Sequence, residues 1–159
     1  MVNVLGTPSL TLTHTMQWNN SRNSYLFLVS LTQHWLVEAG LSLNHTRVQD
    51  IKTAARYRSG AGVRAIISLN NWSMFTLLDV ETNTECGTTN KEFPPRNVFP
   101  GYREVMVMQN TNPMMGTCGT ISWQLVEINM RLIIMWSVPF NFNIRDSYYA
   151  IGLTHNKVF

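Results

Sequence analysis

Short apolar runs separated by turn residues make up most of the chain from Val63 onward. Some runs alternate apolar with polar positions, as half-buried strands do, and others are apolar throughout, as buried strands are. The six runs are VRAIISL, MFTLLDV, REVMVMQ, TISWQLV, RLIIMWSV and SYYAIGL. Strands at this spacing predict an all-β fold, either a sandwich of two sheets or a barrel.

The segments between these runs carry turn signals. Residues 93–101 contain three prolines and a glycine, which predicts a loop or an edge crossing because proline cannot donate a hydrogen bond to a sheet. Residues 109–119 predict a second long loop, and the EINM sequence at 127–130 predicts the turn of a hairpin. Residues 1–45 are harder to interpret, since alternating threonines and an aromatic segment fit either two strands or one strand and a helix.

A short helix is predicted at about residues 47–59. Thr46 and Gln49 have the spacing of a reciprocal capping box, Asp50 lies in the first turn, and Gly60 follows as a left-handed stop. The apolar stripe of this helix is narrow, which suits packing on a sheet better than insertion into a membrane.

The composition fits one globular domain, with 159 residues of which 45% are hydrophobic and 13% charged. The net charge of +3 falls short of a nucleic-acid-binding signature, and we predict no nucleic-acid partner. Five of the twelve cations lie between Arg47 and Arg64. This cluster fits a face for anionic headgroups, but a solvated helix face is the simpler interpretation.

Nothing in the sequence predicts catalysis, a metal site or a cofactor. The four histidines lack metal-ligand spacing, and there is no Gly-rich phosphate loop. Asp146, Ser147 and His155 could be drawn as a catalytic triad, but no G-x-S-x-G elbow surrounds the serine. We therefore predict a non-enzymatic chain without a cofactor. Cys86 and Cys118 permit one disulfide, and two free thiols fit at least as well.

The chain has no apolar run long enough to span a bilayer. Its start also lacks the basic and apolar regions of a signal peptide, so the sequence gives no support for secretion.

Apolar side chains outside the expected strand cores suggest an adhesive surface. The loop after Trp136 places Phe140 and Phe142 among asparagines and leads to Tyr148 and Tyr149, a pattern that fits either an interfacial anchor or the filled end of a sandwich. Met114 and Met115 lie in a loop, where we expect one of them to tuck beneath it. The strand methionines are expected to fill the core, and they are Met106, Met108, Met130 and Met135.

The segment SVPFNFN at 137–143, followed by SYYAIGL, resembles the actinoporins, the pore-forming cytolysins of sea anemones, and more closely the actinoporin-like proteins of vertebrates and other animals. Residues 118–139 are similar to the strand-hairpin-strand that enters this motif in the family. The family's Val-Pro-x-Gly approach to a strand is matched by Val98, Pro100 and Gly101, and RAIISLNN from Arg64 resembles its first strand after the N-terminal helix.

The resemblance covers about residues 56–153 and implies a two-sheet β-sandwich flanked by a short helix. Residues 46–159 are expected to form this domain and residues 1–45 to be an unmatched N-terminal segment. Because the family continues well beyond the position of Leu153, the C-terminal part of its fold is expected to be missing. The family also uses an N-terminal amphipathic helix that detaches to line a pore.

The resemblance further implies a phosphocholine-headgroup site at one end of the sandwich. Carried over by position, the headgroup residues are Cys86, Ile121, Ser137, Pro139, Arg145, Tyr148 and Tyr149, and the membrane anchors are Phe140 and Phe142. Ile144 and Arg145 stand where the family has Trp-Tyr, which removes two rings that would attract a quaternary ammonium. Arg145 would instead contact the phosphate.

The first hypothesis is therefore a membrane-binding protein of the pore-forming type that recognises choline-bearing lipids, with weak binding and poor permeabilisation expected. The implied partners are membrane lipids and further copies of the chain on the membrane. The family implies secretion and action at a target membrane, while the absent signal peptide leaves a cytoplasmic location open. The alternatives are a carbohydrate-binding module, since fungal fruit-body lectins have a similar fold, and an inactive fragment.

Overall fold

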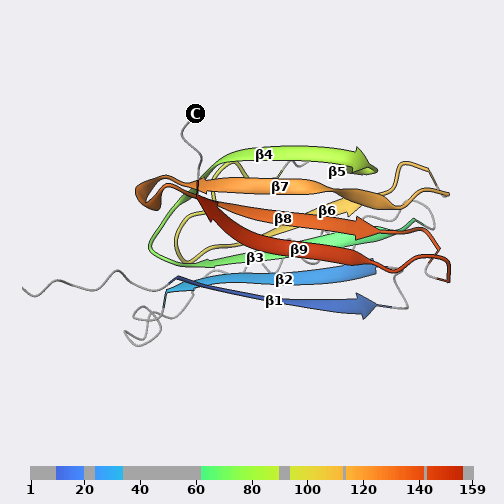
Figure 1. Cartoon of the computed structure of the whole chain (residues 1–159), viewed down its shortest axis with the longest axis horizontal. Helices are drawn as coiled ribbons and strands as arrows, with labels where there is room; N and C mark the ends of the chain where they lie inside the picture. The colour runs from blue at the N-terminus through green and yellow to red at the C-terminus, as the bar shows by residue number, and fades with distance from the viewer. Residues whose placement is uncertain are drawn as a thin grey trace, which may run out of the picture.

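The computed structural model describes residues 10–19, 24–33, 62–89, 94–112, 114–141 and 143–155. These residues form a β-sandwich of two layers (Figure 1). The strands are β1 (Leu10–Asn19), β2 (Ser24–Gln33), β3 (Arg64–Trp72), β4 (Leu77–Cys86), β5 (Thr88–Thr89), β6 (Arg103–Gln109), β7 (Thr117–Leu125), β8 (Met130–Val138) and β9 (Tyr148–His155). One sheet has five strands in the order β1-β2-β3-β6-β5, and the other has four in the order β4-β7-β8-β9.

The predicted strands are confirmed. The six apolar runs correspond to β3, β4, β6, β7, β8 and β9, and they form a sandwich rather than a barrel. The ambiguous N-terminal region supplies two strands, β1 and β2, which pair as an antiparallel hairpin and join the same sheet as β3. The helix predicted at 47–59 lies outside the described residues.

The hairpin between β7 and β8 turns through η2, a short 3-10 helix at Val126–Ile128. Asn129 closes the turn in the left-handed conformation, with φ of 50°, and its N–H donates to the carbonyl of Val126. Asparagine tolerates this conformation better than most residues, so the predicted EINM turn forms as expected.

The core lies between the two sheets because each strand turns alternate side chains inward. In β7, Thr117, Gly119, Ile121, Trp123 and Leu125 are buried, while the residues between them are half-buried. The buried Trp123 donates from its indole nitrogen to the carbonyl of Pro95 at 3.1 Å, which ties the proline-rich segment to the sandwich. A large buried ring of this kind needs such a partner for its polar atom.

The strand methionines only partly follow the prediction. Met106 and Met108 are buried in the core, and Met130 is half-buried. Met135 is 47% exposed, so the expectation that it fills the core is wrong. Alternation along β8 gives the inward position to its neighbour Trp136, which is 3% exposed.

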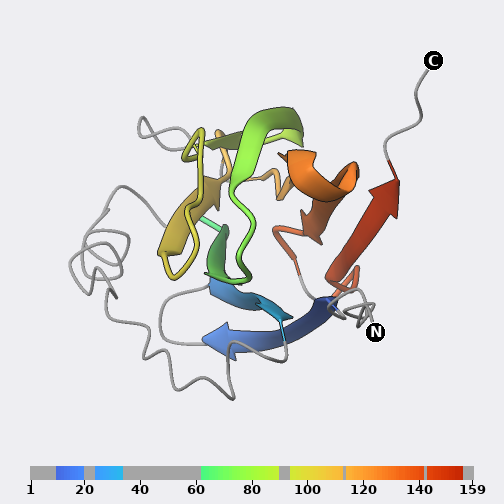
Figure 2. The same ribbon diagram turned by 90° about the vertical axis from the view of Figure 1, so that its left-hand side faces the viewer.

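The sandwich has two ends, which we call the η2 end and the disulfide end. At the η2 end, Leu77 of β4 pairs with Leu125 of β7, and at the disulfide end Cys86 pairs with Cys118. Figure 1 shows the η2 turn at the left, and Figure 2 turns that left-hand side toward the viewer.

The chain passes from one sheet to the other at the disulfide end. β4 ends at Cys86, and Gly87 follows with φ of 91° before β5 pairs with β6 in the opposite sheet. A Cβ at Gly87 would lie 2.5 Å from the carbonyl oxygen of Gln109. Glycine is therefore required here both for its backbone conformation and for the close approach.

Candidate functional site

A cavity of about 580 Å³ opens at the disulfide end of the sandwich. Four segments line it, namely the end of β4, the residues 114–118 that enter β7, the residues 137–141 that leave β8, and the residues 144–148 that lead into β9. This volume is in the range of small-molecule sites. We call it the disulfide-end cavity.

Strand register explains why these segments meet. Cys86 pairs with Cys118, Cys118 with Ser137, and Ser137 with Tyr148, which gives one continuous row across all four strands. Residues that are far apart in the sequence are thereby placed side by side at the mouth of the cavity.

Most of the site residues expected from the sequence line this one cavity. They are Cys86, Ser137, Pro139, Phe140, Arg145 and Tyr148. Phe142 lies outside the described residues. Six of the residues that the family resemblance identifies therefore lie together in the structure.

Ile121 is not brought to the cavity. Its side chain is 0% exposed and lies in the core, because inward-facing positions of β7 alternate with outward-facing ones. Cys118, three residues earlier, has the outward parity that the site requires.

Tyr149 also turns away from the disulfide-end cavity. Its ring is half-buried against the core, with its centroid 5.6 Å from that of Phe27 and 5.3 Å from that of His14. Tyr148 and Tyr149 thus have different environments, since neighbouring residues of a strand point to opposite faces.

The rim of the cavity is apolar and exposed. Met114, Ile144 and Tyr148 are 77%, 71% and 66% exposed, and Phe140 and Met115 lie beside them at 46% and 44%. The expectation that one of the two loop methionines tucks beneath the loop is wrong, since both are exposed. The role of Ile144 at the rim was missed, because the sequence comparison treated it only as the loss of an aromatic ring.

Two charged side chains lie at the same rim, Arg145 and Asp146, and both residues are exposed. A tight turn presents them, in which the carbonyl of Asn141 accepts from the N–H groups of Ile144 and Arg145, each at 3.3 Å. The side-chain oxygen of Asn141 also accepts from the N–H of Asn143 at 3.0 Å. The cavity therefore offers a guanidinium and a carboxylate beside an aromatic ring.

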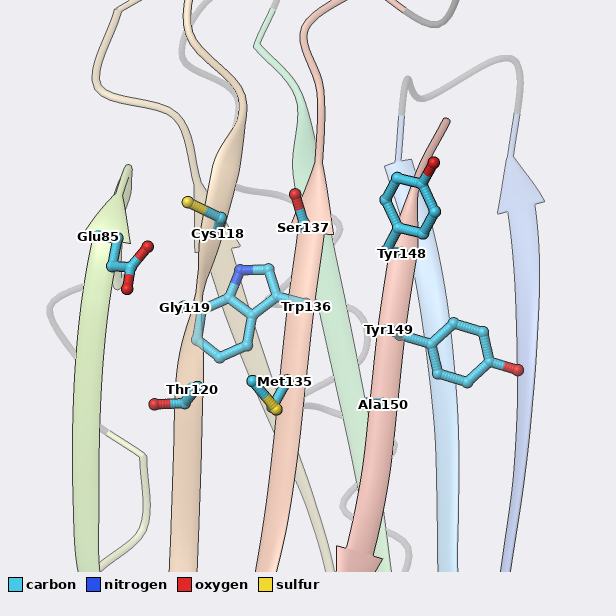
Figure 3. A pocket seen from close by; sticks show the side chains of 10 residues that line it. All are labelled: Glu85, Cys118, Gly119, Thr120, Met135, Trp136, Ser137, Tyr148, Tyr149 and Ala150. Atoms are coloured by element: carbon cyan, nitrogen blue, oxygen red, sulfur yellow. The ribbon is translucent and has the colours of Figure 1, made fainter. Parts of the chain in front are cut away.

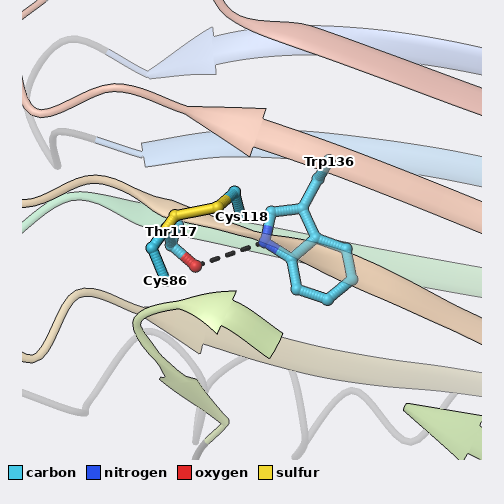
Figure 4. Close-up of a disulfide and its surroundings, with 4 residues drawn as sticks. All are labelled: Cys86, Thr117, Cys118 and Trp136. Atoms are coloured by element: carbon cyan, nitrogen blue, oxygen red, sulfur yellow. Dashed lines mark hydrogen bonds between the residues drawn. A yellow bond between two sulfur atoms is a disulfide. The ribbon is translucent and has the colours of Figure 1, made fainter. Parts of the chain in front are cut away.

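A disulfide joins Cys86 to Cys118 (Figure 4). Both residues line the cavity. Their Cα atoms are 4.9 Å apart, and the bond fastens the edge strand β4 to β7. The sequence permits this bridge but fits two free thiols at least as well, and the structure has the bridge. Beside the bond, the indole nitrogen of Trp136 donates to the hydroxyl of Thr117 at 3.2 Å.

A second hollow, a groove of about 340 Å³, adjoins the cavity on the outer face of the four-stranded sheet (Figure 3). The two hollows share Cys118, Ser137 and Tyr148. Register shifts between Thr84 and Cys86, so that the intervening Glu85 is an extra residue on β4. Such a bulge redirects a side chain, and here Glu85 lines the groove.

Catalytic and metal-binding arrangements are not found in the described part of the chain. His155 ends β9 at the η2 end, whereas Asp146 and Ser147 precede β9 at the disulfide end, so these three residues do not form a triad. The described residues contain no cluster of three or more His, Cys, Asp or Glu side chains that could hold a metal ion. Among the helices within these residues, none has the length and apolarity to cross a membrane.

Known proteins match both the sequence and the fold. No family model matches the chain. Tereporin-Ts1 from Terebra subulata is 33% identical over 122 residues, which cover 75% of this chain and 55% of the relative. Tereporin-Ca1 from Terebra anilis is 31% identical over 125 residues, covering 77% and 62%. The chain thus spans little more than half the length of these relatives.

A solved structure supports the fold. The crystal structure of the lipid binding protein Nakanori superposes with a TM-score of 0.65 over 77% of this chain and 61% of that one, at 17% sequence identity. At this identity the likeness establishes the sandwich architecture alone. The sequence similarity to the tereporins shows that the chain is related to the actinoporin-like pore-forming toxins, a non-enzymatic family, as the lack of a catalytic motif predicted.

Proposed function

We propose that this chain attaches to bilayer surfaces by holding choline-bearing lipid headgroups in the disulfide-end cavity. The observation that carries the proposal is the row Cys86, Cys118, Ser137 and Tyr148, which gathers the residues expected from the family into one cavity with an apolar rim.

The chemistry of the cavity matches a zwitterionic headgroup. The exposed ring of Tyr148 can face a quaternary ammonium, a cation–π contact of about 0.5 to 2 kcal/mol. Arg145 at the same rim supplies a guanidinium for the phosphate. A phosphate and an ammonium within one cavity thus each have a partner of suitable charge or polarity.

The rim supplies the second part of the binding energy. Met114, Phe140 and Ile144 surround the mouth and can enter the boundary between headgroups and acyl chains. Partial burial of these side chains contributes at about 25 cal/mol per Å² of apolar surface. Binding therefore combines a headgroup contact inside the cavity with apolar contacts around it.

We further propose that attachment, rather than permeabilisation, is the main effect of this chain on a bilayer. The helix predicted at 47–59 is shorter than the roughly 20 residues that a spanning helix needs, and several cations lie on or beside it. Moving those charges through the hydrocarbon would be costly.

The headgroup proposal is tested by co-sedimentation with phosphatidylcholine vesicles and by titration with free phosphocholine. Tyr148→Ala should weaken the binding of free phosphocholine by about fivefold, which corresponds to loss of a contact of about 1 kcal/mol. Arg145→Gln should weaken it similarly. Thr154→Ala, an exposed position on the same strand at the opposite end, is the matched control and should bind like the native chain.

Two results would contradict this proposal. One is equal phosphocholine binding by the native chain and Tyr148→Ala. The other is saturable binding to a glycan array without any binding to phosphocholine, which would favour a carbohydrate-binding module. Dye release from the same vesicles tests the second part, and strong release by the native chain would show that permeabilisation was underestimated.

A further inference from the structure

Exposed apolar side chains also gather at the η2 end, far from the disulfide-end cavity. Two segments carry them, residues 72–76 from the last residue of β3 to the start of β4, and residues 98–102 before β6. Their large exposed side chains are Trp72 at 36%, Met74 at 50%, Phe99 at 51% and Tyr102 at 43%. We call these four residues the Trp72 surface. Figure 2 looks onto the end of the sandwich where the two loops lie.

The two loops are in direct contact. The N–H of Asn71 donates to the carbonyl of Tyr102 at 2.9 Å, and the N–H of Gly101 donates to the carbonyl of Asn71 at 2.7 Å. The rings of Phe99 and Tyr102 have their centroids 6.1 Å apart. The two segments therefore bring the four residues to the same end of the sandwich, where the rings of Phe99 and Tyr102 lie side by side.

A buried amide holds this patch in place. Asn71 is 0% exposed, and its side-chain nitrogen donates to the carbonyl of Phe75 at 2.7 Å and to that of Val98 at 2.9 Å. Its side-chain oxygen accepts from the hydroxyl of Ser73 at 2.6 Å. One side chain thus fixes both loops, so the exposed rings are presented without an ordering cost at the moment of binding.

The backbone of the loops is largely satisfied from within the protein. The backbone N–H groups with internal acceptors are those of Asn71, Ser73, Phe75, Leu77, Val98, Gly101 and Tyr102. This matters because polar backbone groups without partners make entry into a lipid environment costly.

The charges near the patch also suit a phospholipid. Residues 72–76 and 94–102 contain no acidic residue, and their single charged residue is the exposed Arg96. On the neighbouring sheet, the η2 turn adds the exposed Val126 and one acid, Glu127. The carboxylates of Asp79 and Glu81 near the same end are paired with Arg131. Tryptophan and tyrosine beside an arginine is the composition found where proteins meet headgroups.

We propose that the Trp72 surface is a second bilayer-contacting site, which binds phospholipid surfaces without requiring choline. It lies at the opposite end of the sandwich from the disulfide-end cavity, separated from it by the ten residues of β4, or about 33 Å of strand. If the proposed headgroup function also holds, one molecule can contact two bilayers and bridge them. The bridging consequence rests on that function, whereas the second site does not.

The second site is tested on vesicles of phosphatidylethanolamine and phosphatidylglycerol, which contain no choline. The chain carries Tyr148→Ala and Ile144→Ser, which remove apolar contacts at the disulfide end, and the buffer contains about 0.5 M salt to screen the cations. This double variant, the background for the test, should still sediment with the vesicles. Adding Trp72→Ser and Phe99→Ser should lower the bound-to-free ratio by about tenfold.

The controls separate a contact from a folding defect. Trp72→Phe with Phe99→Trp keeps two rings at the patch and should retain binding within about twofold of the background. Thermal unfolding and circular dichroism of every variant check that the sandwich persists, and Met74→Gln alone provides a milder change at a position that is half exposed.

Unchanged sedimentation after the Trp72 and Phe99 substitutions would overturn the proposal. So would light scattering that shows a native dimer made monomeric by them, since the occupant of the patch would then be a second copy. Bridging is measured separately by the aggregation of phosphatidylcholine vesicles. In that assay, the Trp72→Ser, Phe99→Ser variant should still sediment with the vesicles but should no longer aggregate them. Failure of the native chain to bind free phosphocholine would count against the headgroup function alone.

Discussion

The two ends of the sandwich use the same strands but are stabilised in different ways. At the disulfide end, a covalent bond joins β4 to β7, and the loops around it leave a cavity of about 580 Å³. At the η2 end, the buried Asn71 and a set of backbone hydrogen bonds draw two loops together over the sheet ends. One end encloses a space and the other presents a surface.

The difference teaches how a fold can place two kinds of contact on one framework. A cavity needs walls that stay apart, and a bond between two strands keeps a wall in place without filling the space beside it. A binding surface needs exposed side chains on a fixed backbone, and a buried amide with several partners provides that. The following changes should affect one end much more than the other.

The largest effect is expected from loss of the disulfide. Cys86→Ser with Cys118→Ser opens a link between residues that are 32 apart in the sequence, which should cost about 3 to 4 kcal/mol of unfolding free energy through the freer unfolded chain. Urea unfolding measures this cost. Phosphocholine binding should fall as well, while sedimentation with choline-free vesicles should be retained under conditions where the variant is folded. An unchanged urea midpoint would show that the bond contributes little.

The next largest effect is expected at Asn71. Asn71→Leu removes a donor to the carbonyls of Phe75 and Val98 and leaves the buried N–H of Ser73 without its acceptor, at a cost of about 2 to 3 kcal/mol. The exposed Asn97→Leu in the neighbouring loop is the control and should change stability by less than about 0.5 kcal/mol. Asn71→Leu should weaken sedimentation with choline-free vesicles more than it weakens phosphocholine binding. A larger loss of phosphocholine binding would mean that the two ends are not independent.

A smaller effect is expected at Gly116, which enters the disulfide-end cavity from β7. A Cβ at this position would lie 2.1 Å from the carbonyl oxygen of Val138 and 2.9 Å from the Cα of Pro139. Gly116→Ala should therefore push the cavity wall aside, cost about 1 to 2 kcal/mol, and weaken phosphocholine binding. Gly152→Ala is the matched control, because nothing lies within 4 Å of its added Cβ. Equal stability of the two variants would argue against close packing at Gly116.

The smallest effect is expected from the ion pairs near the η2 end. Arg131 contacts Glu81 at 3.0 Å and Asp79 at 3.5 Å, but the two carboxylate side chains are 68% and 64% exposed. Glu81→Gln should change the unfolding free energy by less than about 0.5 kcal/mol, and the change should vanish at high salt. A loss well above this, insensitive to salt, would mean that charge as well as the Asn71 hydrogen bonds holds this end.

Most of the fold could be predicted from the sequence because the strand signals are local. Period-two alternation and turn residues gave the six strands of β3, β4 and β6 to β9. The N-terminal strands could not be distinguished from a strand and a helix, since the run from Tyr25 to Gln33 is apolar on both faces: its inward residues pack in the core, while Leu26 and Leu28 are half-buried on the other side. Periodicity is least informative for such a segment.

The candidate site could be predicted residue by residue, but not the direction of each side chain. The resemblance assigned Ile121 to the site by its position in the sequence alone. The alternation of side chains along β7 places this residue in the core instead. The disulfide could not be decided either, because two cysteines 32 residues apart contain no information about register. The Trp72 surface was missed for a related reason, since its loops are far apart in the sequence and are brought together by hydrogen bonds such as those of the buried Asn71.

The parallel pairing of β2 with β3 has a consequence for the speed of folding. Paired residues such as Ser30 and Asn70 are 40 positions apart, whereas the hairpins β1–β2 and β7–β8 join close neighbours in the chain. Closing a longer loop costs entropy before any contact repays it, so we expect the hairpins to form early and the β2–β3 seam, like the long-range β3–β6 and β4–β7 pairs, to close later, with folding in milliseconds to seconds. Stopped-flow refolding of Ser30→Ala, which loses its hydrogen bond across the seam, should show faster unfolding and an almost unchanged folding rate. A slowed folding rate would place the seam in the transition state.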